Sequence, residues 1–201
     1  MLPSSLLCAL RRAAPLTFFC FLGTISTIEA QTATFALAPS GRATTVIEIT
    51  KQTPRDTPPS QRPAPLRVSI DYGQPHVRGR DVLSLMPLDT AWRTGANSAT
   101  GLTTDVDLVI GGVKVPKGNY TLFTIRSKSG TRLIVNKQVG QWGTQYDATQ
   151  DLARIDMRTR RLTESLDALQ IALAPAATGL KGVLRIVWGT VALEADWEAK
   201  P

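Results

Sequence analysis

The segment TAWRTGANSAT, residues 90–100, gathers residue types that could bind a polar ligand. Arg93 can hold a carboxylate through two parallel hydrogen bonds, and the Asn97 amide offers both a donor and an acceptor. Trp92 and, farther along the chain, Trp142 provide flat surfaces for packing or for stacking a ring. The segment follows neither helical nor strand periodicity, so we expect it to form a loop.

A second segment, residues 136–154, has the same character and contains Trp142, Asp151 and Arg154. We expect Arg93 to pair with an acid, most simply Asp151 and alternatively Asp71, and so to join the two loops. Two interpretations stay open: a buried polar clasp that pins the loops to the scaffold, or an open site suited to a glycan or a small anion. The candidate binding residues also include two arginines of the segment 77–80, and are Arg78, Arg80, Trp92, Arg93, Asn97, Trp142, Asp151 and Arg154.

Catalytic arrangements find little support. His76 is the only histidine, so a Ser-His-Asp triad must use it, and the Gly-x-Ser-x-Gly pattern of a nucleophile elbow is missing. Two pairs of acids could in principle supply the two carboxyl groups of a glycosidase. We interpret Asp105 and Asp107 instead as solvated strand residues, and Asp147 with Asp151 as part of a helix cap. We therefore assign no catalytic residue, no metal and no cofactor. A hydrolase acting on glycans or esters is kept as the alternative to a non-catalytic binding module.

The first thirty residues predict export. Arg11 and Arg12 precede an apolar run at 16–25, and Ala30 supplies a small residue at the expected cut, which is the pattern of a signal peptide. The run is shorter than the roughly 20 residues of a transmembrane helix, and no transmembrane segment is expected after cleavage. Both cysteines lie in this segment, so the mature chain is expected to hold no disulfide and no thiol. The expected location is the periplasm or the exterior of the cell.

The chain is basic, with a formal net charge of +7. Removal of residues 1–30 takes away Arg11, Arg12 and Glu29 and leaves about +6. A basic exported protein can sit against anionic lipid, glycan or another acidic polymer, and the simpler reading is a solvated basic surface. No nucleic-acid-binding motif is present, and the oligomeric state is left open.

Residues 31–65 are predicted to be a proline-rich extended arm or linker, because five of the thirteen prolines fall between Pro54 and Pro65. Within this arm the stretches 32–38 and 44–50 alternate and are candidate edge strands. From residue 66 onward, apolar residues recur with a period of two, as they do in strands with one buried face. The clearest examples are RVSIDY at 67–72, DVDLVI at 105–110, VLRIVW at 183–188 and VALEADW at 191–197.

Turn signals separate these stretches. Gly111-Gly112 predicts a hairpin and Gly189-Thr190 a break between the last two strands. The stretch 147–154 begins with an acidic N-cap and predicts one short helix, whereas 163–174 fits helix or strand and is assigned to a strand. The predicted fold is mainly β: an antiparallel β-sandwich, or a sandwich-like barrel, spanning residues 66–198.

Several motifs follow one another in a distinctive order: VRGR at 77–80, WRTGAN at 92–97, GGVKVPKGNYTLFTI at 111–125 and NKQVGQWGTQYDATQDLAR at 136–154. With these motifs the chain resembles, from about Leu66 to Glu198, a bacterial exported family known as domain of unknown function 2911. The resemblance implies a β-rich, sandwich-like domain and export, and it implies no particular activity. The chain departs from the family pattern at Gln74, His76 and the pair at 88–89.

Overall fold

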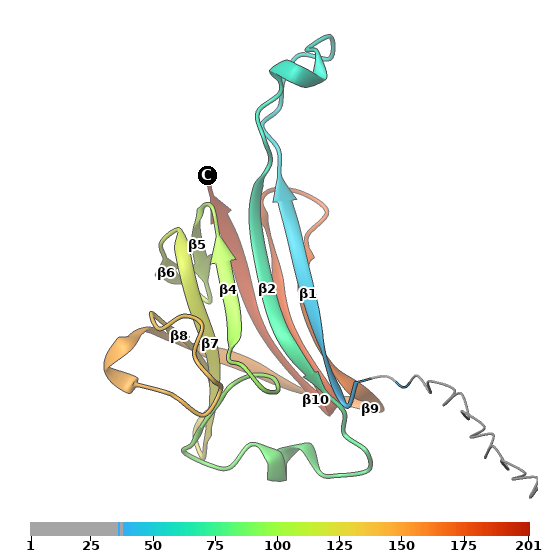
Figure 1. The fold of residues 1–201 in the computed structure, drawn as a ribbon, viewed down its shortest axis with the longest axis vertical. Helices are drawn as coiled ribbons and strands as arrows, with labels where there is room; N and C mark the ends of the chain where they lie inside the picture. Colours follow the sequence, from blue (N-terminus) through green and yellow to red (C-terminus); the bar gives the residue numbers. More distant parts are fainter. Residues whose placement is uncertain (1–35, 37) are drawn as a thin grey trace, which may run out of the picture. The chain divides into compact units, whose positions relative to one another are not determined.

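The computed structural model describes residue 36 and residues 38–201 (Figure 1). The predicted signal peptide at 1–30 and nearly all of the candidate strand at 32–38 lie outside the described residues. The described part folds into one antiparallel sheet in the order β1-β2-β4-β7-β8-β9-β10-β5-β6, with β3 paired to β7. The strands are β1 (Ser40–Ile49), β2 (Leu66–Pro75), β3 (Ala91–Trp92), β4 (Thr100–Thr104), β5 (Asp107–Ile110), β6 (Val113–Val115), β7 (Gly118–Ser127), β8 (Gly130–Asn136), β9 (Asp151–Pro175) and β10 (Lys181–Lys200).

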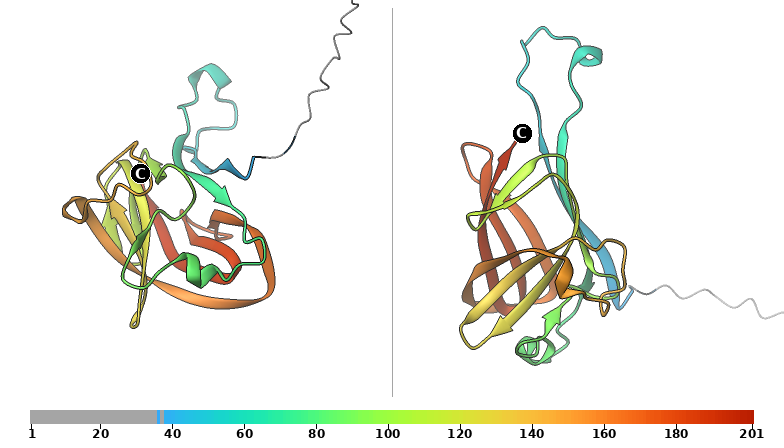
Figure 2. Two further views of the ribbon diagram at one scale, coloured as in Figure 1. Left: turned by 60° about the horizontal axis from the view of Figure 1, so that its bottom comes forward. Right: turned by 90° about the vertical axis from the view of Figure 1, so that its left-hand side faces the viewer.

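The mainly-β, sandwich-like fold is confirmed. The sheet curls so that β1, β2, β4, β7 and β8 face β5, β6 and β10 across the core (Figure 2). The long strand β9 belongs to both layers, because its first residues pair with β8 and its later residues with β10. The Ile171 amide of β9 donates to the buried hydroxyl of Tyr72 on β2, at 3.1 Å, which ties the layers together. The alternating apolar residues of the sequence fill the space between them, as Val68, Ile70, Leu184, Ile186 and Leu193 illustrate.

The predicted hairpin at Gly111-Gly112 is confirmed, and both glycines have positive φ angles. The predicted break at Gly189-Thr190 is wrong, since both residues lie within the single strand β10. The pairing of β10 with β9 shifts register on either side of Gly189, whose φ is 57°. A glycine adopts this left-handed geometry without steric cost, so the strand bends at a bulge and continues instead of turning.

The proline-rich arm is shorter than the sequence suggested. Residues 40–49 form β1, which pairs along its whole length with β2, so the sheet starts before residue 66. The candidate strand at 44–50 is therefore confirmed as far as Ile49, and the strand begins four residues earlier, at Ser40. Residues 50–65 form the remaining excursion, with one 3₁₀ turn, η1 (Pro59–Gln61), and extend beyond the ends of β1 and β2 (Figure 1).

The predicted short helix is reduced to a single 3₁₀ turn, η3 (Ala148–Gln150), with Asp147 as its N-cap. The chain enters β9 at Asp151, opposite Asn136 of β8, so strand pairing overrides the local helix signal. The ambiguous stretch 163–174 lies within β9, as predicted. A third 3₁₀ turn, η2 (Val82–Leu85), lies between β2 and β3. None of the helices in the described part is long and apolar enough to cross a membrane.

Candidate functional site

The loop at 93–99, between β3 and β4, is held firmly against β2. The Ala96 amide donates to the Gly73 carbonyl at 3.2 Å, and a Cβ at position 73 would collide with the Ala96 backbone. Thr94 is fully buried, and its hydroxyl lies 2.7 Å from that of Thr124. Both Thr94 and Asn97 have left-handed φ angles, of 52° and 63°. A β-branched residue rarely adopts this conformation, so surrounding contacts maintain local strain in this loop.

The two loops singled out in the sequence are joined, but through main-chain groups. Ser98 forms an antiparallel bridge with Trp142, and the Gly143 amide donates to the Asn97 carbonyl at 3.0 Å. The Arg93 guanidinium donates to that same carbonyl at 3.2 Å. The Arg93 side chain occupies the place where a Cβ of residue 143 would lie, so glycine is needed there for close approach.

The predicted pairing of Arg93 with Asp151 is wrong. The Asp151 carboxylate accepts hydrogen bonds from the Tyr146 hydroxyl at 2.8 Å and from Arg154 Nε at 2.8 Å. Its second oxygen accepts from the Asn136 amide at 2.9 Å. A single carboxylate with these donors has no need of a further cation, and Arg93 instead bonds a main-chain oxygen. The alternative partner Asp71 is also engaged elsewhere, with Arg42 and Thr44 of β1.

The Asp151 cluster, which consists of Asn136, Tyr146, Asp151 and Arg154, has a buried inner part and an exposed arginine. The Asn136 side chain is fully buried, and only 10% of the Asp151 side chain is exposed. Burial, the hydrogen bond to Asp151 and the negative charge of Asp151 together raise the pKa of Tyr146 to about 12. The cluster anchors the 137–150 loop, because Asn136 also donates to the Asp147 carbonyl at 2.8 Å. Asp151 and Arg154 therefore act mainly as structural groups.

The tryptophans divide into a packing residue and an exposed one. Trp92 stacks on Trp188 of β10, with ring centroids 5.5 Å apart and an interplanar angle of 3°. Trp142 keeps 51% of its surface exposed although its backbone is bridged to Ser98. We call Arg93, Asn97, Trp142 and Gln145 the loop face. Within it the Gln145 side chain accepts from the Trp142 amide at 3.3 Å, which fixes the turn that carries the indole.

Arg78 and Arg80 belong to a different place, the turn after β2. There the His76 Nδ1 lies 2.7 Å from the carboxylate of Asp167 on β9, and the Arg78 amide donates to the same carboxylate at 2.9 Å. The backbone bond from Arg78 and the bond to His76 lower the pKa of Asp167 below its usual value. Arg80 donates to the carbonyls of His76 and Val77 at 2.8 and 3.1 Å. This arrangement fastens the end of β2 to β9.

The remaining acids have local roles. Asp105 accepts from the Arg67 amide at 2.8 Å and Asp107 from the Lys117 amide at 2.9 Å, so both stabilise turns. Asp147 caps η3 through Thr149, and this bonding lowers the pKa of its carboxyl. Asp147 is thus a cap residue and Asp107 a strand residue, as interpreted, whereas Asp105 lies in the connection between β4 and β5 and not in a strand. Within the described ranges no group of three or more metal-ligating side chains comes together.

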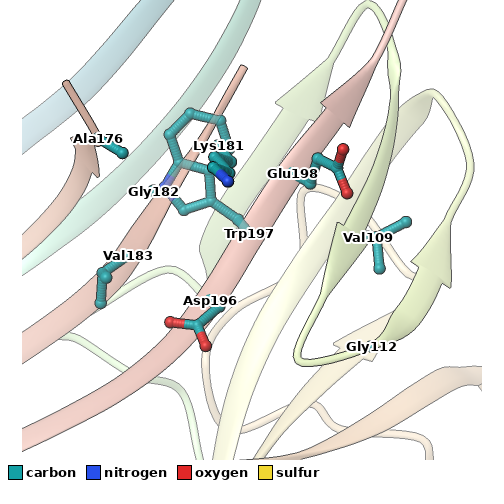
Figure 3. Close-up of a pocket in the computed structure, with 9 residues that line it drawn as sticks. All are labelled: Val109, Gly112, Ala176, Lys181, Gly182, Val183, Asp196, Trp197 and Glu198. Carbon is teal, nitrogen blue, oxygen red and sulfur yellow. The ribbon is translucent and has the colours of Figure 1, made fainter. Parts of the chain in front are cut away.

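A separate cavity of about 470 Å³ lies between the first residues of β10, its last residues and the β5–β6 hairpin (Figure 3). Trp197 is one of the residues that line it, and its indole N–H is buried without a hydrogen-bond partner among the described residues. Lys181, Asp196 and Glu198 line the cavity, but Asp196 is already engaged by a bidentate bond from Arg158 at 2.7 and 2.9 Å. The cavity includes none of the eight predicted binding residues.

The structure thus separates the predicted site residues into four groups. Arg93, Asn97 and Trp142 lie together, Asp151 and Arg154 form a structural cluster beside them, Arg78 and Arg80 lie at the turn after β2, and Trp92 packs against Trp188. Sequence reasoning missed Asn136 and Tyr146. Asn136 had a detectable signal, since it is a polar residue that ends the otherwise apolar run RLIVN. Tyr146 had no such signal within its polar loop.

Comparison with known proteins gives one match. The model of a family described as "Protein of unknown function (DUF2911)" matches residues 54–196, which is more than half of the chain. No curated protein and no solved structure matches the chain. The matched range contains all eight predicted binding residues and the whole of the Asp151 cluster.

Proposed function

The chain belongs to the DUF2911 family, and for this member we propose an exported, non-catalytic module that binds an acidic glycan of the cell envelope through the loop face. One observation carries the proposal: Trp142 presents a half-exposed indole on a loop whose backbone is fixed. An aromatic ring that is already held in place can stack on a sugar without a further loss of conformational entropy.

The neighbouring polar groups suit the same ligand. Asn97 is exposed, and the Arg93 guanidinium uses one nitrogen for the Asn97 carbonyl while its other donors remain for a carboxylate. The strain at Thr94 and Asn97 adds support, because left-handed non-glycine residues concentrate at ligand sites. The net charge of about +6 that remains after removal of residues 1–30 favours an acidic polymer over a neutral one.

Calorimetric titration with oligomers of a polyuronic acid, as the acidic glycan, tests this proposal. Replacement of Trp142 by alanine removes the stacking surface, and we expect affinity to fall about tenfold, as loss of one aromatic contact predicts. Val139→Ala is the matched control, since Val139 lies in the same loop and is 57% exposed. Equal affinity of both variants, or failure to bind polyuronate and peptidoglycan sacculi alike, would contradict the loop-face proposal.

A hydrolase is the second candidate, and it rests on the His76–Asp167 contact of 2.7 Å. A carboxylate that orients a histidine is half of a catalytic triad. Among the described residues, no hydroxyl forms a hydrogen bond with the His76 ring, and Asp167 also bonds the Arg78 backbone. We therefore expect p-nitrophenyl acetate to be hydrolysed no faster by the protein than by its His76→Gln variant. A rate that depends on His76 would favour the hydrolase.

Export is proposed from the charge and apolarity of residues 1–30. The intact mass of protein recovered from the periplasm or medium tests it. We expect a chain that begins at Gln31, and a protein that retains Met1 would contradict export by cleavage.

A further inference from the structure

The outer edge of β1 is an unpaired strand edge. β1 pairs with β2 on one side, and no other strand of the described chain pairs with its second side. Along this edge, alternate residues direct their main-chain N–H and C=O groups away from the sheet. The excursion at 50–65 extends past the strand ends and, within the described part of the chain, does not pair with this edge (Figure 1). Such an edge is a template for another strand.

The side chains of β1 are arranged in two alternating sets. Arg42, Thr44, Val46 and Glu48 are the more exposed set, and Val46 keeps 48% of its surface exposed. Ala43 and Ile47 belong to the other set and pack against the core. The exposed set therefore has a cation near one end, an anion near the other and two β-branched residues between them.

This order is self-complementary about Thr45. In an antiparallel pair of two copies centred on Thr45, Arg42 of each copy lies opposite Glu48 of the other. Thr44 then lies opposite Val46, and Ala43 opposite Ile47, so that polar, β-branched and apolar residues are matched on both faces. A shift of the centre by one residue to Thr44 would place Arg42 opposite Val46 and leave Glu48 opposite Ser40. Only the register centred on Thr45 satisfies both charges.

The neighbouring strand extends this complementarity. Arg42 forms an ion pair with Asp71, and Glu48 pairs with Arg67 at 2.8 Å, both across β1 and β2. In the two-copy arrangement the charges alternate in sign from β2 of one copy to β2 of the other. Alternating charges stabilise cross-strand pairing, whereas like charges placed opposite one another oppose it.

We propose that the protein forms a two-fold symmetric dimer in which the β1 strands of two copies pair antiparallel, centred on Thr45, to make one continuous sheet. The partner is a second copy of this chain, selected by the Arg42–Glu48 pairs that occur twice in the interface. The arrangement leaves Trp142 outside the pairing edge, so dimerisation and ligand binding can be measured separately.

Sedimentation velocity over a range of protein concentrations tests the dimer with charge-reversal variants. Arg42→Glu places two acids opposite each other at both symmetric positions, and Glu48→Arg places two bases there. Each variant alone should raise the dimer dissociation constant about tenfold or more. An equimolar mixture of the two variants restores both opposite-charge pairs across the interface, as does the double variant Arg42→Glu/Glu48→Arg, so each should dimerise more tightly than either single variant alone.

Thermal unfolding monitored by circular dichroism shows whether each variant folds, and the mixture provides a test that does not depend on the stability of either one alone. Lys128→Glu, on the exposed turn between β7 and β8, is a matched charge-reversal control that should leave the dimer unchanged. A wild-type monomer up to about 1 mM would overturn the dimer. Single variants that dimerise normally, or a mixture that fails to recover, would overturn the β1 register.

Discussion

Removal of the Asp151 carboxylate should unfold the protein at markedly lower denaturant concentration. Asp151→Ala eliminates three hydrogen bonds, from Tyr146, Arg154 and Asn136, in a cluster where the carboxyl side chain is 10% exposed. Removing one member of a fully buried ion pair costs about 3–5 kcal/mol, and of an exposed pair about 0–1 kcal/mol. The Arg154 side chain is 38% exposed, so the expected loss in the free energy of unfolding is about 2–3 kcal/mol.

A double-mutant cycle separates this cluster from the loop face. Asp151→Ala combined with Arg154→Met should cost at least about 1 kcal/mol less than the sum of the single losses, because the two groups interact directly. Asp151→Ala combined with Arg93→Ala should be additive within about 0.5 kcal/mol, since Arg93 bonds the Asn97 carbonyl instead. Urea unfolding followed by circular dichroism gives the free energy of unfolding of the wild type and of the five variants. Strong coupling of Arg93 to Asp151, or a loss below about 1 kcal/mol for Asp151→Ala, would refute this assignment of partners.

Three further predictions concern titration and packing. Folding raises the pKa of Tyr146 from 10.0 to about 12, so the contribution of its protonated hydroxyl to stability is complete below pH 10 and is lost as the pH rises to about 12. The fall in the urea midpoint at alkaline pH should therefore be smaller in Tyr146→Phe than in the wild type. The backbone hydrogen bond from Arg78 lowers the pKa of Asp167 from 3.8, so the contribution of the ionised carboxylate to stability is present above pH 3.8 and disappears on further acidification. On acid titration, Asp167→Asn should therefore lose stability less steeply than the wild type. Gly73→Ala should lower the free energy of unfolding by about 2–3 kcal/mol, whereas Gly41→Ala, which meets no atom within 4 Å, should change the urea midpoint little.

Much of the fold could be predicted from the sequence because each strand of a one-sided sheet must alternate. The stretches at 67–72 and 191–197 carry that pattern and lie in strands, and in the stretch 105–110 the strand β5 takes the last four residues. The failures have a common cause, namely that local signals compete with long-range pairing. The acidic cap at Asp147 supports a single turn, after which pairing with β8 takes over, and Gly189 is equally compatible with a turn or a bulge.

The meeting of the two loops could be predicted from the sequence, but the contacts within them could not. The concentration of Arg, Asn, Trp and Asp correctly indicated two loops that meet, yet it could not specify which acid pairs with which base. Arg154 lies three residues from Asp151, and the pairing of β9 with β8 shifts register between them, with Leu152 as the extra residue on β9. This irregularity leaves no mark on the local periodicity. The exposure of Trp142 could not be predicted either, because Trp92 and Trp142 both lie in polar segments and only the fold stacks Trp92 on Trp188 while it leaves Trp142 exposed.

The most direct test of the loop face is a two-dimensional ¹H–¹⁵N NMR titration that follows the indole N–H signals of the four tryptophans. Trp142→Phe assigns the signal of the exposed indole, and oligomers of polyuronic acid are then added to the wild-type protein. We predict that the Trp142 signal shifts progressively while those of Trp92, Trp188 and Trp197 stay in place. A Trp142 signal that does not move, with or without a shift of Trp197 in the cavity of β10, would contradict the assignment of ligand binding to this loop face.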